Sequence, residues 1–472
     1  MVYDLAFLVI FLVLTSIFLF KKRKNIKKEG LLLLYKTSVG MKIIDKIGKK
    51  YTKLLNFLSY VSIVLGFGLM ITIIYLFGKI VWIYVFHTEI VSLIKIPPIA
   101  PLIPYLPQIF KLSYLPPFYF IYWIVILAVV AMSHEFFHGI FAVNKKVNIK
   151  STGFGFFPFF FPVFLAAFVE LDEKEMDKKK IKSQMAILSA GTFANTLLAI
   201  LSLALLVIFF SLAFTPSGVI FDTYTYSAVG LSAITSVNNL NVNNLSYSQL
   251  LNLTNVTGFS KISVGEMDFL TTESFLQSQE ENENYVFLYD DAPAINANLS
   301  SIILKINGVD ITNRESLGIE LSKYSPGDKV MITSLMDDYN KDSEIILGKT
   351  PLNDTKAYLG IGFLNKKSSG ILGAITSWFT SFKDSTIYYI PKFEAAEFIY
   401  NFLWWLLMIN FSVALMNMLP VGIFDGGKFF YLAIFALTKS KEKAKKTSKL
   451  LTYLFLFLVL VIMVFWVIGL FK

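Results

Sequence analysis

An unbroken apolar run from Phe118 to Val143 constrains this sequence most, because it is long enough to cross a bilayer as a single helix. His134, Glu135 and His138 lie inside it. Ionisable side chains are costly at membrane depth, so a functional role is their default explanation. The run therefore predicts a membrane span built around a polar site.

These three residues form the pattern His-Glu-Phe-Phe-His. On a helix, residues four apart share a face, so both imidazoles can reach one metal ion while Glu135 lies about 100° further round. Zinc hydrolases use two such histidines as ligands and the glutamate as the base that deprotonates water. The chain has only three histidines, which makes a chance match rare. The alternative is a pair of polar residues bonded to neighbouring helices, but the spacing favours a Zn²⁺ site.

Composition indicates the fold class. Hydrophobic residues make up 55% of the 472 residues and charged residues 16%, which is too apolar for a soluble protein. We predict a mainly α-helical polytopic membrane protein, with a small β element on the cytoplasmic side and an extracytoplasmic α+β domain. The chain has no cysteine, so a metal must be held by nitrogen and oxygen ligands. About six spans are expected, near residues 5–20, 54–86, 118–143, 184–214, 398–419 and 450–470.

Charge is divided unevenly along the chain. Residues 215–397 carry 12 Lys and Arg against 21 Asp and Glu, a net charge of −9, which leaves +19 for the rest. The basic excess lies in short connections between apolar spans, as expected for loops kept in the cytoplasm. It indicates a multi-pass protein of a lipid bilayer, with residues 215–397 outside, and no nucleic-acid partner. Because no organelle signal is present, a prokaryotic cell membrane is the expected location.

The spans and loops suggest four regions. Residues 1–116 hold two membrane segments, a basic cytoplasmic stretch at 29–53 and a proline-rich outer loop at 96–117; residues 117–214 hold the histidine span, short strands or a re-entrant hairpin at 153–169, and a further span. Residues 215–397 form the polar domain, and residues 398–472 hold the last two spans. In the polar domain, stretches 234–242 and 303–311 resemble each other, each reading as strand, tight turn and strand before a helical stretch.

A catalytic zinc ion needs three protein ligands and an open position. The predicted topology puts His87 on the wrong side of the membrane, so the third ligand is expected to be a carboxylate. Asp425 is preferred because Pro420 breaks the preceding helix and two glycines follow, which lets the backbone bend back. The alternative role for Asp425 is an N-cap of the next helix. The other carboxylate candidates are Glu170, Asp172 and Glu173.

Two asparagines and a glycine in the spans complete the set of candidates. Asn417, near the end of the fifth span, could donate to the oxyanion of a tetrahedral intermediate or hold the substrate backbone, or it could bond to another helix. Asn195 lies in an apolar span, so it needs a partner, either backbone or a group at the site. Gly191 in the same span allows another helix to approach closely.

Together these motifs resemble the site-2 proteases, zinc metalloproteases that cut membrane-spanning substrates. The resemblance rests on the histidine motif in a span, on Gly191 with Asn195 in the next, and on Asn417 through Asp425 after a later span. It implies that residues 118–214 and 398–437 form the catalytic core. It also implies that His134, His138 and Asp425 bind zinc, that Glu135 is the general base and that Asn417 contacts the substrate. Residues 215–397 resemble the PDZ modules that this family often carries.

The resemblance implies a zinc-dependent intramembrane endoprotease that cleaves transmembrane segments of single-span protein or peptide substrates near the cytoplasmic leaflet. One alternative is a membrane-embedded zinc protease that trims soluble or lipidated peptide ends and completes its site with a glutamate. Another is a non-catalytic membrane receptor that binds peptides through its outer domain.

Overall fold

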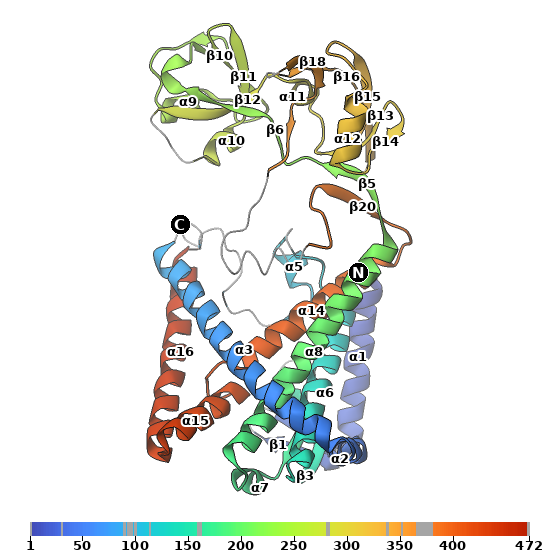
Figure 1. The fold of residues 1–472 in the computed structure, drawn as a ribbon, viewed down its shortest axis with the longest axis vertical. Helices are drawn as coiled ribbons and strands as arrows, with labels where there is room; N and C mark the ends of the chain where they lie inside the picture. Colours follow the sequence, from blue (N-terminus) through green and yellow to red (C-terminus); the bar gives the residue numbers. More distant parts are fainter. Residues whose placement is uncertain are drawn as a thin grey trace. The chain divides into compact units, whose positions relative to one another are not determined.

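The chain forms two compact units (Figure 1). Residues 1–210 and 397–472 make up the first, here called the membrane unit, and residues 211–396 make up the second, here called the inserted unit. The computed structural model describes residues 2–29, 32–87, 91, 98, 102–112, 115–157, 163–279, 284–336, 339–350, 353–364 and 381–469.

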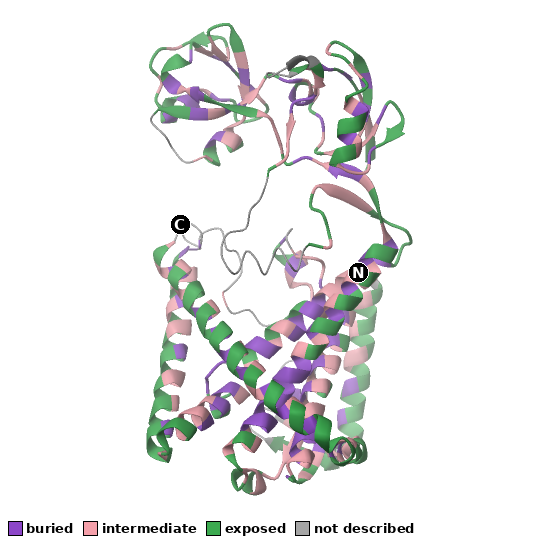
Figure 2. Ribbon diagram, in the orientation of Figure 1, coloured by how far each residue is buried: buried purple, intermediate pink, exposed green. Residues whose placement is uncertain are grey.

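Six helices of the described chain are long and apolar enough to cross a bilayer. The prediction of a polytopic membrane protein with about six spans is therefore confirmed. About a third of the most apolar part of α6 and of α14 is buried, against 6% in α1, so α6 and α14 are central and α1 is peripheral (Figure 2). The six helices are α1 (Val2–Lys21), α3 (Thr52–Phe86), α6 (Phe120–Asn144), α8 (Ile181–Ala213), α14 (Ala396–Asn417) and α16 (Lys441–Gly469).

A four-stranded antiparallel sheet packs against the histidine helix α6. Its strands, in spatial order, are β1 (Ile26–Glu29), β2 (Leu32–Thr37), β3 (Ile149–Phe157) and β4 (Val163–Leu171). The short strands or hairpin expected at 153–169 are confirmed as the antiparallel pair β3 and β4, and residues 158–162 between them lie outside the described residues. The stretch at 29–53, predicted to be basic and cytoplasmic, has two parts. In the first part, β2 pairs with β3 along five residues. The second part is the helix α2 (Met41–Lys50).

The proline-rich loop is fastened to the ends of the central helices. The described part of this loop contains the short helix α5 (Leu106–Ile109). The indole N–H of Trp123 donates to the carbonyl of Leu102 at 2.8 Å, and that of Trp405 donates to the carbonyl of Pro117 at 3.0 Å. Asp4 of α1 accepts from the first free backbone N–H groups of α6, at 2.8 and 3.0 Å, and so caps that helix from a neighbouring one.

Two shorter helices lie at the same end of the membrane unit as the sheet (Figure 1). They are α7 (Glu173–Asp177) and α15 (Asp425–Thr438). With 14 residues, α15 is too short to cross a bilayer, as expected from its apolar stretch. It begins directly after the loop that leaves α14, and this loop returns Asp425 to the bundle.

The inserted unit contains two main antiparallel sheets, each with its own buried apolar core. The first sheet has the order β7-β12-β11-β10-β8-β9, and the second has the order β16-β15-β13-β5-β20 with β14 paired to β13. The elements of the first are β7 (Tyr226–Gly230), β8 (Ser236–Val237), β9 (Leu240–Asn241), α9 (Tyr247–Leu253), β10 (Ser260–Val264), β11 (Met267–Thr271), α10 (Glu273–Gln277) and β12 (Tyr285–Asp290). Those of the second are β5 (Phe214–Ile220), α11 (Pro293–Asn296), β13 (Ile302–Ile306), β14 (Val309–Asp310), α12 (Arg314–Leu321), β15 (Lys329–Met336), β16 (Tyr339–Ile346) and β20 (Ile387–Pro391). Two further pairs of short strands are β6 (Thr223–Tyr224) with β19 (Ile361–Gly362) and β17 (Gly348–Thr350) with β18 (Asn353–Tyr358).

The two similar sequence stretches fold alike. Each makes a tight hairpin whose first turn residue is an asparagine with positive φ, Asn238 at 50° and Asn307 at 47°. Each asparagine oxygen accepts the backbone N–H of a neighbouring strand, from Lys261 at 3.0 Å and from Met331 at 2.8 Å. Each hairpin precedes a capped helix, α9 or α12, and a second hairpin. The same asparagine-containing hairpin therefore occurs twice in this unit.

Candidate metal centre and catalytic residues

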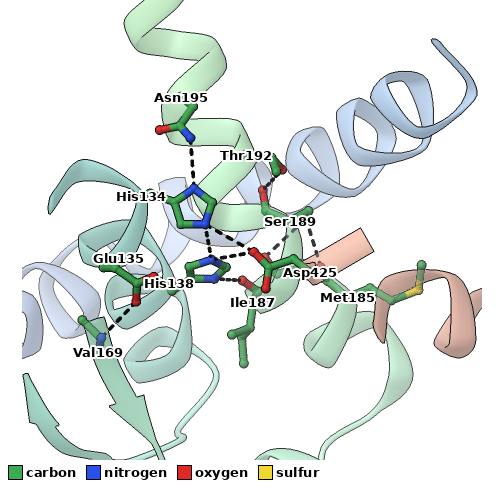
Figure 3. A network of polar contacts seen from close by, with 11 residues as sticks. His134, Glu135, His138, Val169, Met185, Ile187, Ser189, Thr192, Asn195 and Asp425 are labelled. Atoms are coloured by element: carbon green, nitrogen blue, oxygen red, sulfur yellow. Dashed lines mark hydrogen bonds and ion pairs between the residues drawn. The ribbon is translucent and has the colours of Figure 1, made fainter. Parts of the chain in front are cut away.

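The two histidines of α6 point toward one another within the membrane unit (Figure 3). His134 and His138 are both buried, and their Nε2 atoms are 3.0 Å apart. The four-residue spacing places them on one face of the helix, as the sequence predicted. Both rings therefore present a nitrogen to the same point.

Asp425 reaches that point from the first turn of α15. Its Oδ2 lies 3.3 Å from His134 Nε2 and 3.2 Å from His138 Nε2. The glycines after it are required by the fold of the loop, because a Cβ on Gly426 or on Gly427 would lie 2.4 Å from a backbone atom of the loop.

The alternative role for Asp425 is not realised. The N-cap residue of α15 is Phe424, which makes no side-chain capping bond, and Asp425 is the first helical residue. Its carboxylate is directed at the histidines instead (Figure 3).

Helix α8 supports the other nitrogen of each ring. His138 Nδ1 lies 2.7 Å from the carbonyl oxygen of Ile187, which can only accept, so Nδ1 carries the proton and Nε2 keeps its lone pair. His134 Nδ1 lies 3.0 Å from the side-chain amide of Asn195. The amide oxygen of Asn195 is buried and has no hydrogen-bond partner among the described residues. Turning this amide over lets its oxygen accept from His134 Nδ1–H, which leaves the Nε2 lone pair of His134 free as well.

Gly191 of α8 makes room for both rings. A Cβ at this position would lie 2.4 Å from His134 Nε2 and 2.4 Å from His138 Nε2, closer than any real contact. The sequence indicated close helix approach at this residue, and the partner is the imidazole pair itself. Any larger residue at position 191 must displace the histidines.

The donor set fits a divalent cation. Its three donor atoms are separated by 3.0, 3.2 and 3.3 Å. Nitrogen and oxygen donors about 2.0–2.1 Å from a tetrahedral zinc ion would be about 3.4 Å apart. Two imidazole lone pairs and a carboxylate oxygen repel one another at this distance unless a cation lies between them. His134, His138 and Asp425 are therefore the residues that could hold a metal ion.

Glu135 lies beside this group on α6 and faces the sheet. Its Oε2 accepts the backbone N–H of Val169 at 2.9 Å (Figure 3). Val169 belongs to β4, the edge strand of the sheet, and its register partner on β3 is Thr152. Because Val169 N–H donates to Glu135, it lies on the open edge of β4 and outside the ladder with β3.

A family model for peptidase family M50 matches residues 122–462, more than two thirds of the chain. The chain belongs to peptidase family M50. This is the site-2 protease family, so the family resemblance of the motifs is confirmed. The match includes both histidines and Asp425, and it makes the protein a membrane metalloprotease. No curated protein matches the chain.

In this M50 peptidase the other three carboxylate candidates are engaged elsewhere. Glu170 bonds to Lys36 Nζ at 2.8 Å and to Ser151 Oγ at 2.5 Å, across β2, β3 and β4. These hydrogen bonds lower the pKa of the Glu170 carboxyl. Asp172 caps α7, and Glu173 pairs with Lys428 at 3.4 Å. The structure therefore brings Asp425 to the histidines and keeps the other three carboxylates in structural bonds.

Asn417 is not brought into a bond at the M50 site. It is the last residue of α14 and is half-buried, and its side chain has no hydrogen bond with the described part of the chain. Ile187 and Val169 act through backbone atoms, so no side-chain signal in the sequence pointed to them. Asn195 did give a signal, because an amide in an apolar span must find a partner.

Proposed function

We propose that this M50 metalloprotease is a zinc-dependent intramembrane endoprotease that cleaves transmembrane segments of membrane protein substrates. One observation carries the proposal. A carboxylate from α15 and two imidazoles from a membrane-spanning helix converge to within 3.3 Å inside the membrane unit. A hydrolytic centre at this depth faces chains that lie in the bilayer.

The ligands would be His134 and His138, through Nε2, and Asp425. A zinc ion held there supplies a Lewis acid that polarises a carbonyl and lowers the pKa of water toward 7. Glu135 takes the proton from the attacking water and passes it to the leaving amine. Ile187 and Asn195 hold the rings in the tautomer that leaves Nε2 unprotonated. Asn417 is proposed as a substrate contact on the family resemblance.

The open edge of β4 supports a way of presenting the substrate. A transmembrane helix must unwind before cleavage, because its carbonyls are occupied by hydrogen bonds within the helix. An added strand beside β4 would satisfy the freed backbone groups. Such a strand would also take the N–H of Val169, which Glu135 now occupies, and would release the carboxylate for catalysis. Substrate pairing and release of the base are then one event.

Cross-linking tests the strand model, since the chain has no cysteine of its own. A cysteine at Ala167 on β4 should form a disulfide with a cysteine placed near the cleaved bond of the substrate. A cysteine at Lys27 on β1, the opposite edge, is the control. Equal cross-linking at both edges would reject pairing at β4.

The distribution of charged residues along the chain supports a proposal for the location and orientation of the protein. At the end of the membrane unit that holds the metal group, the chain carries basic runs after α1 and in the first turns of α16, whereas residues 215–397 are net acidic. Lysine and arginine are retained on the cytoplasmic side. We therefore propose a prokaryotic cell membrane with the centre near the cytoplasmic leaflet and the inserted unit, as a PDZ-like region, outside.

The alternatives have less support. A protease for soluble or lipidated peptide ends would use a glutamate as third ligand, but Glu170 is bonded to Lys36 and Ser151. A non-catalytic receptor would not need Glu135, Asn195 and the three donors arranged around one point.

Replacing Glu135 with glutamine tests the mechanism. In proteoliposomes with a single-span substrate, the wild type should contain stoichiometric zinc and cleave within the span. E135Q should keep its zinc and lose cleavage, whereas D425A should lose both. Cleavage by E135Q would reject Glu135 as the base. Hydrolysis of soluble peptides alone would favour the peptide-end alternative.

A further inference from the structure

A second site lies in the membrane unit, at the end of α6 beyond the histidines. A cavity of about 630 Å³ is lined by α2, the start of α3, the end of α6 and the first residue of β3. None of the three metal ligands lines it. It lies where α3 begins and α6 ends, which is where the chain leaves the apolar layer.

The cavity is basic. Lys42, Lys49 and Lys146 line it, and Asp45 is the one acidic residue among the described residues of the lining. Asp45 is bound to Lys49 at 2.7 Å. Lys42 and Lys146 have no carboxylate partner among the described residues, so two positive charges at the cavity are not neutralised by the protein.

Lys146 occupies a position that normally belongs to glycine. Its φ is 58°, and the bonds Lys146 N–H to Val143 and Val147 N–H to Ala142, both 2.9 Å, form the motif that ends α6. A lysine is less stable than glycine in this left-handed conformation, because its Cβ crowds the backbone. A side chain kept at such a position in a cavity wall points to a role for its charge.

Asn144 supplies a second, independent observation. Both its amide nitrogen and its amide oxygen are buried, and neither has a hydrogen-bond partner among the described residues. A buried amide without partners costs free energy. A ligand that restores both bonds must accept one hydrogen bond and donate another.

We propose that this cavity binds the headgroup of an acidic phospholipid whose phosphate carries a hydroxyl-bearing group, as in phosphatidylglycerol. The phosphate pairs with Lys42 and Lys146. The Asn144 side chain, whose amide atoms are closed off from solvent, turns toward the headgroup, so that its N–H donates to the phosphate and its oxygen accepts from a headgroup hydroxyl.

A ligand bound in this cavity would also restrain α6, the helix that carries both histidines. Ile44 of α2 packs against Gly139, the residue after His138, at a distance that leaves no room for a larger side chain. Gly48 of α2 packs against Val143 in the same way. A headgroup that joins α2 to the end of α6 therefore holds the helix that carries both histidines.

The test uses the full chain in bilayers of phosphatidylcholine, with or without a minor fraction of phosphatidylglycerol. Lipid retained after gentle extraction is counted by native mass spectrometry, and thermal midpoints are compared. The wild type should retain phosphatidylglycerol and be stabilised by it. The double variant Lys42→Gln with Lys146→Gln should bind it at least about tenfold more weakly. The matched control is Lys46→Gln with Lys53→Gln, which removes two exposed lysines outside the cavity and should behave as wild type.

Asn144→Leu separates binding from folding. Without phosphatidylglycerol this variant should be at least as stable as wild type, because it removes an unsatisfied buried amide. With phosphatidylglycerol it should gain less stability than wild type. Phosphatidic acid, which has the phosphate without the hydroxyls, should stabilise the wild type less than phosphatidylglycerol does. Three results would overturn the lipid site. The first is an equal loss of phosphatidylglycerol binding in both double lysine variants, and the second is an unchanged lipid response in Asn144→Leu. The third is full stabilisation by inorganic phosphate in phosphatidylcholine alone.

Discussion

Two polar clusters of this protein differ in how their hydrogen-bonding groups are satisfied. In the inserted unit, Asn307 accepts from the N–H of Met331 at 2.8 Å and donates to Tyr324 at 2.9 Å, so its amide is satisfied on both sides. In the membrane unit, the lone pairs of His134, His138 and Asp425 converge, and the three groups cannot satisfy one another.

This difference distinguishes polar groups that stabilise the fold from polar groups that bind a ligand. A polar side chain whose hydrogen-bond partners all belong to the chain stabilises the fold. A set of acceptors that meet at one point needs a ligand from outside the chain. The turn asparagines therefore explain how the inserted unit folds, whereas the convergent group explains what the M50 peptidase binds.

The largest expected effect comes from removing one of the converging donors. Asp425→Ala should abolish metal binding and proteolysis, because two imidazoles remain without the third ligand. Glu170→Ala is the matched control, since this carboxylate is bound to Lys36 and Ser151. Metal analysis of both purified variants distinguishes them, and a metal-free E170A beside a metal-loaded D425A would reverse the assignment.

Gly191→Ala should reduce proteolysis nearly as strongly as Asp425→Ala. Its methyl group would lie 2.4 Å from both Nε2 atoms, so the rings must move by about 1 Å, a displacement that costs about 100-fold in kcat/KM. Gly68→Ala in the apolar helix α3 meets no atom within 4 Å and serves as the control. Kinetics with one reconstituted substrate measure both. Equal activity of the two variants would show that the site tolerates the added volume.

Asn195 should have a smaller effect, because it acts through His134. Asn195→Leu should weaken metal affinity by about 10–100-fold, and Asn195→Asp should restore most of it, since a carboxylate also accepts from Nδ1–H. Asn410→Leu, which removes another buried amide from a spanning helix, should leave metal affinity unchanged. Competition with a zinc chelator gives the affinities. Similar losses in N195L and N410L would indicate a general packing effect.

The turn asparagines should change stability and leave the metal centre intact. Asn307→Ala removes two hydrogen bonds and forces alanine into a conformation with φ of 47°, so the inserted unit should lose about 1–3 kcal/mol. Asn340→Ala, at an exposed position of β16, should have little effect. Hydrogen exchange of the full chain should show faster exchange in residues 211–396 of N307A only, with unchanged metal content.

The smallest expected effect is on stability and comes from Glu170, whose hydrogen bonds within the membrane unit are satisfied by Lys36 and Ser151. Hydrogen bonds from Lys36 and Ser151 lower its pKa below the usual 4.5. Its contribution to stability is therefore present above pH of about 4.5 and is lost as the pH falls through the lowered pKa. The thermal midpoint of Glu170→Gln should lie below that of wild type at neutral pH, and the gap should shrink in acid. A gap that widens in acid would contradict a structural role.

The sequence by itself determined much of this protein. Apolar runs long enough to cross a bilayer predicted the six helices, because the bilayer fixes the length of a span. The spacing of His134 and His138 fixed their shared face, because helical periodicity is local. Proline and paired glycines around Asp425 indicated that the chain turns back there.

The tertiary structure decided which distant groups meet. Asp425 and Glu170 were both candidates in the sequence, and only the packing of α15 against α6 and α8 brings one of them to the histidines. The pairing of β2 with β3 joins residues more than one hundred positions apart, which no local pattern encodes. The contacts of His138 with the Ile187 carbonyl and of Glu135 with the Val169 N–H use backbone atoms that every residue has. Such contacts depend on where helices and strands pack, and side-chain identity alone does not specify them.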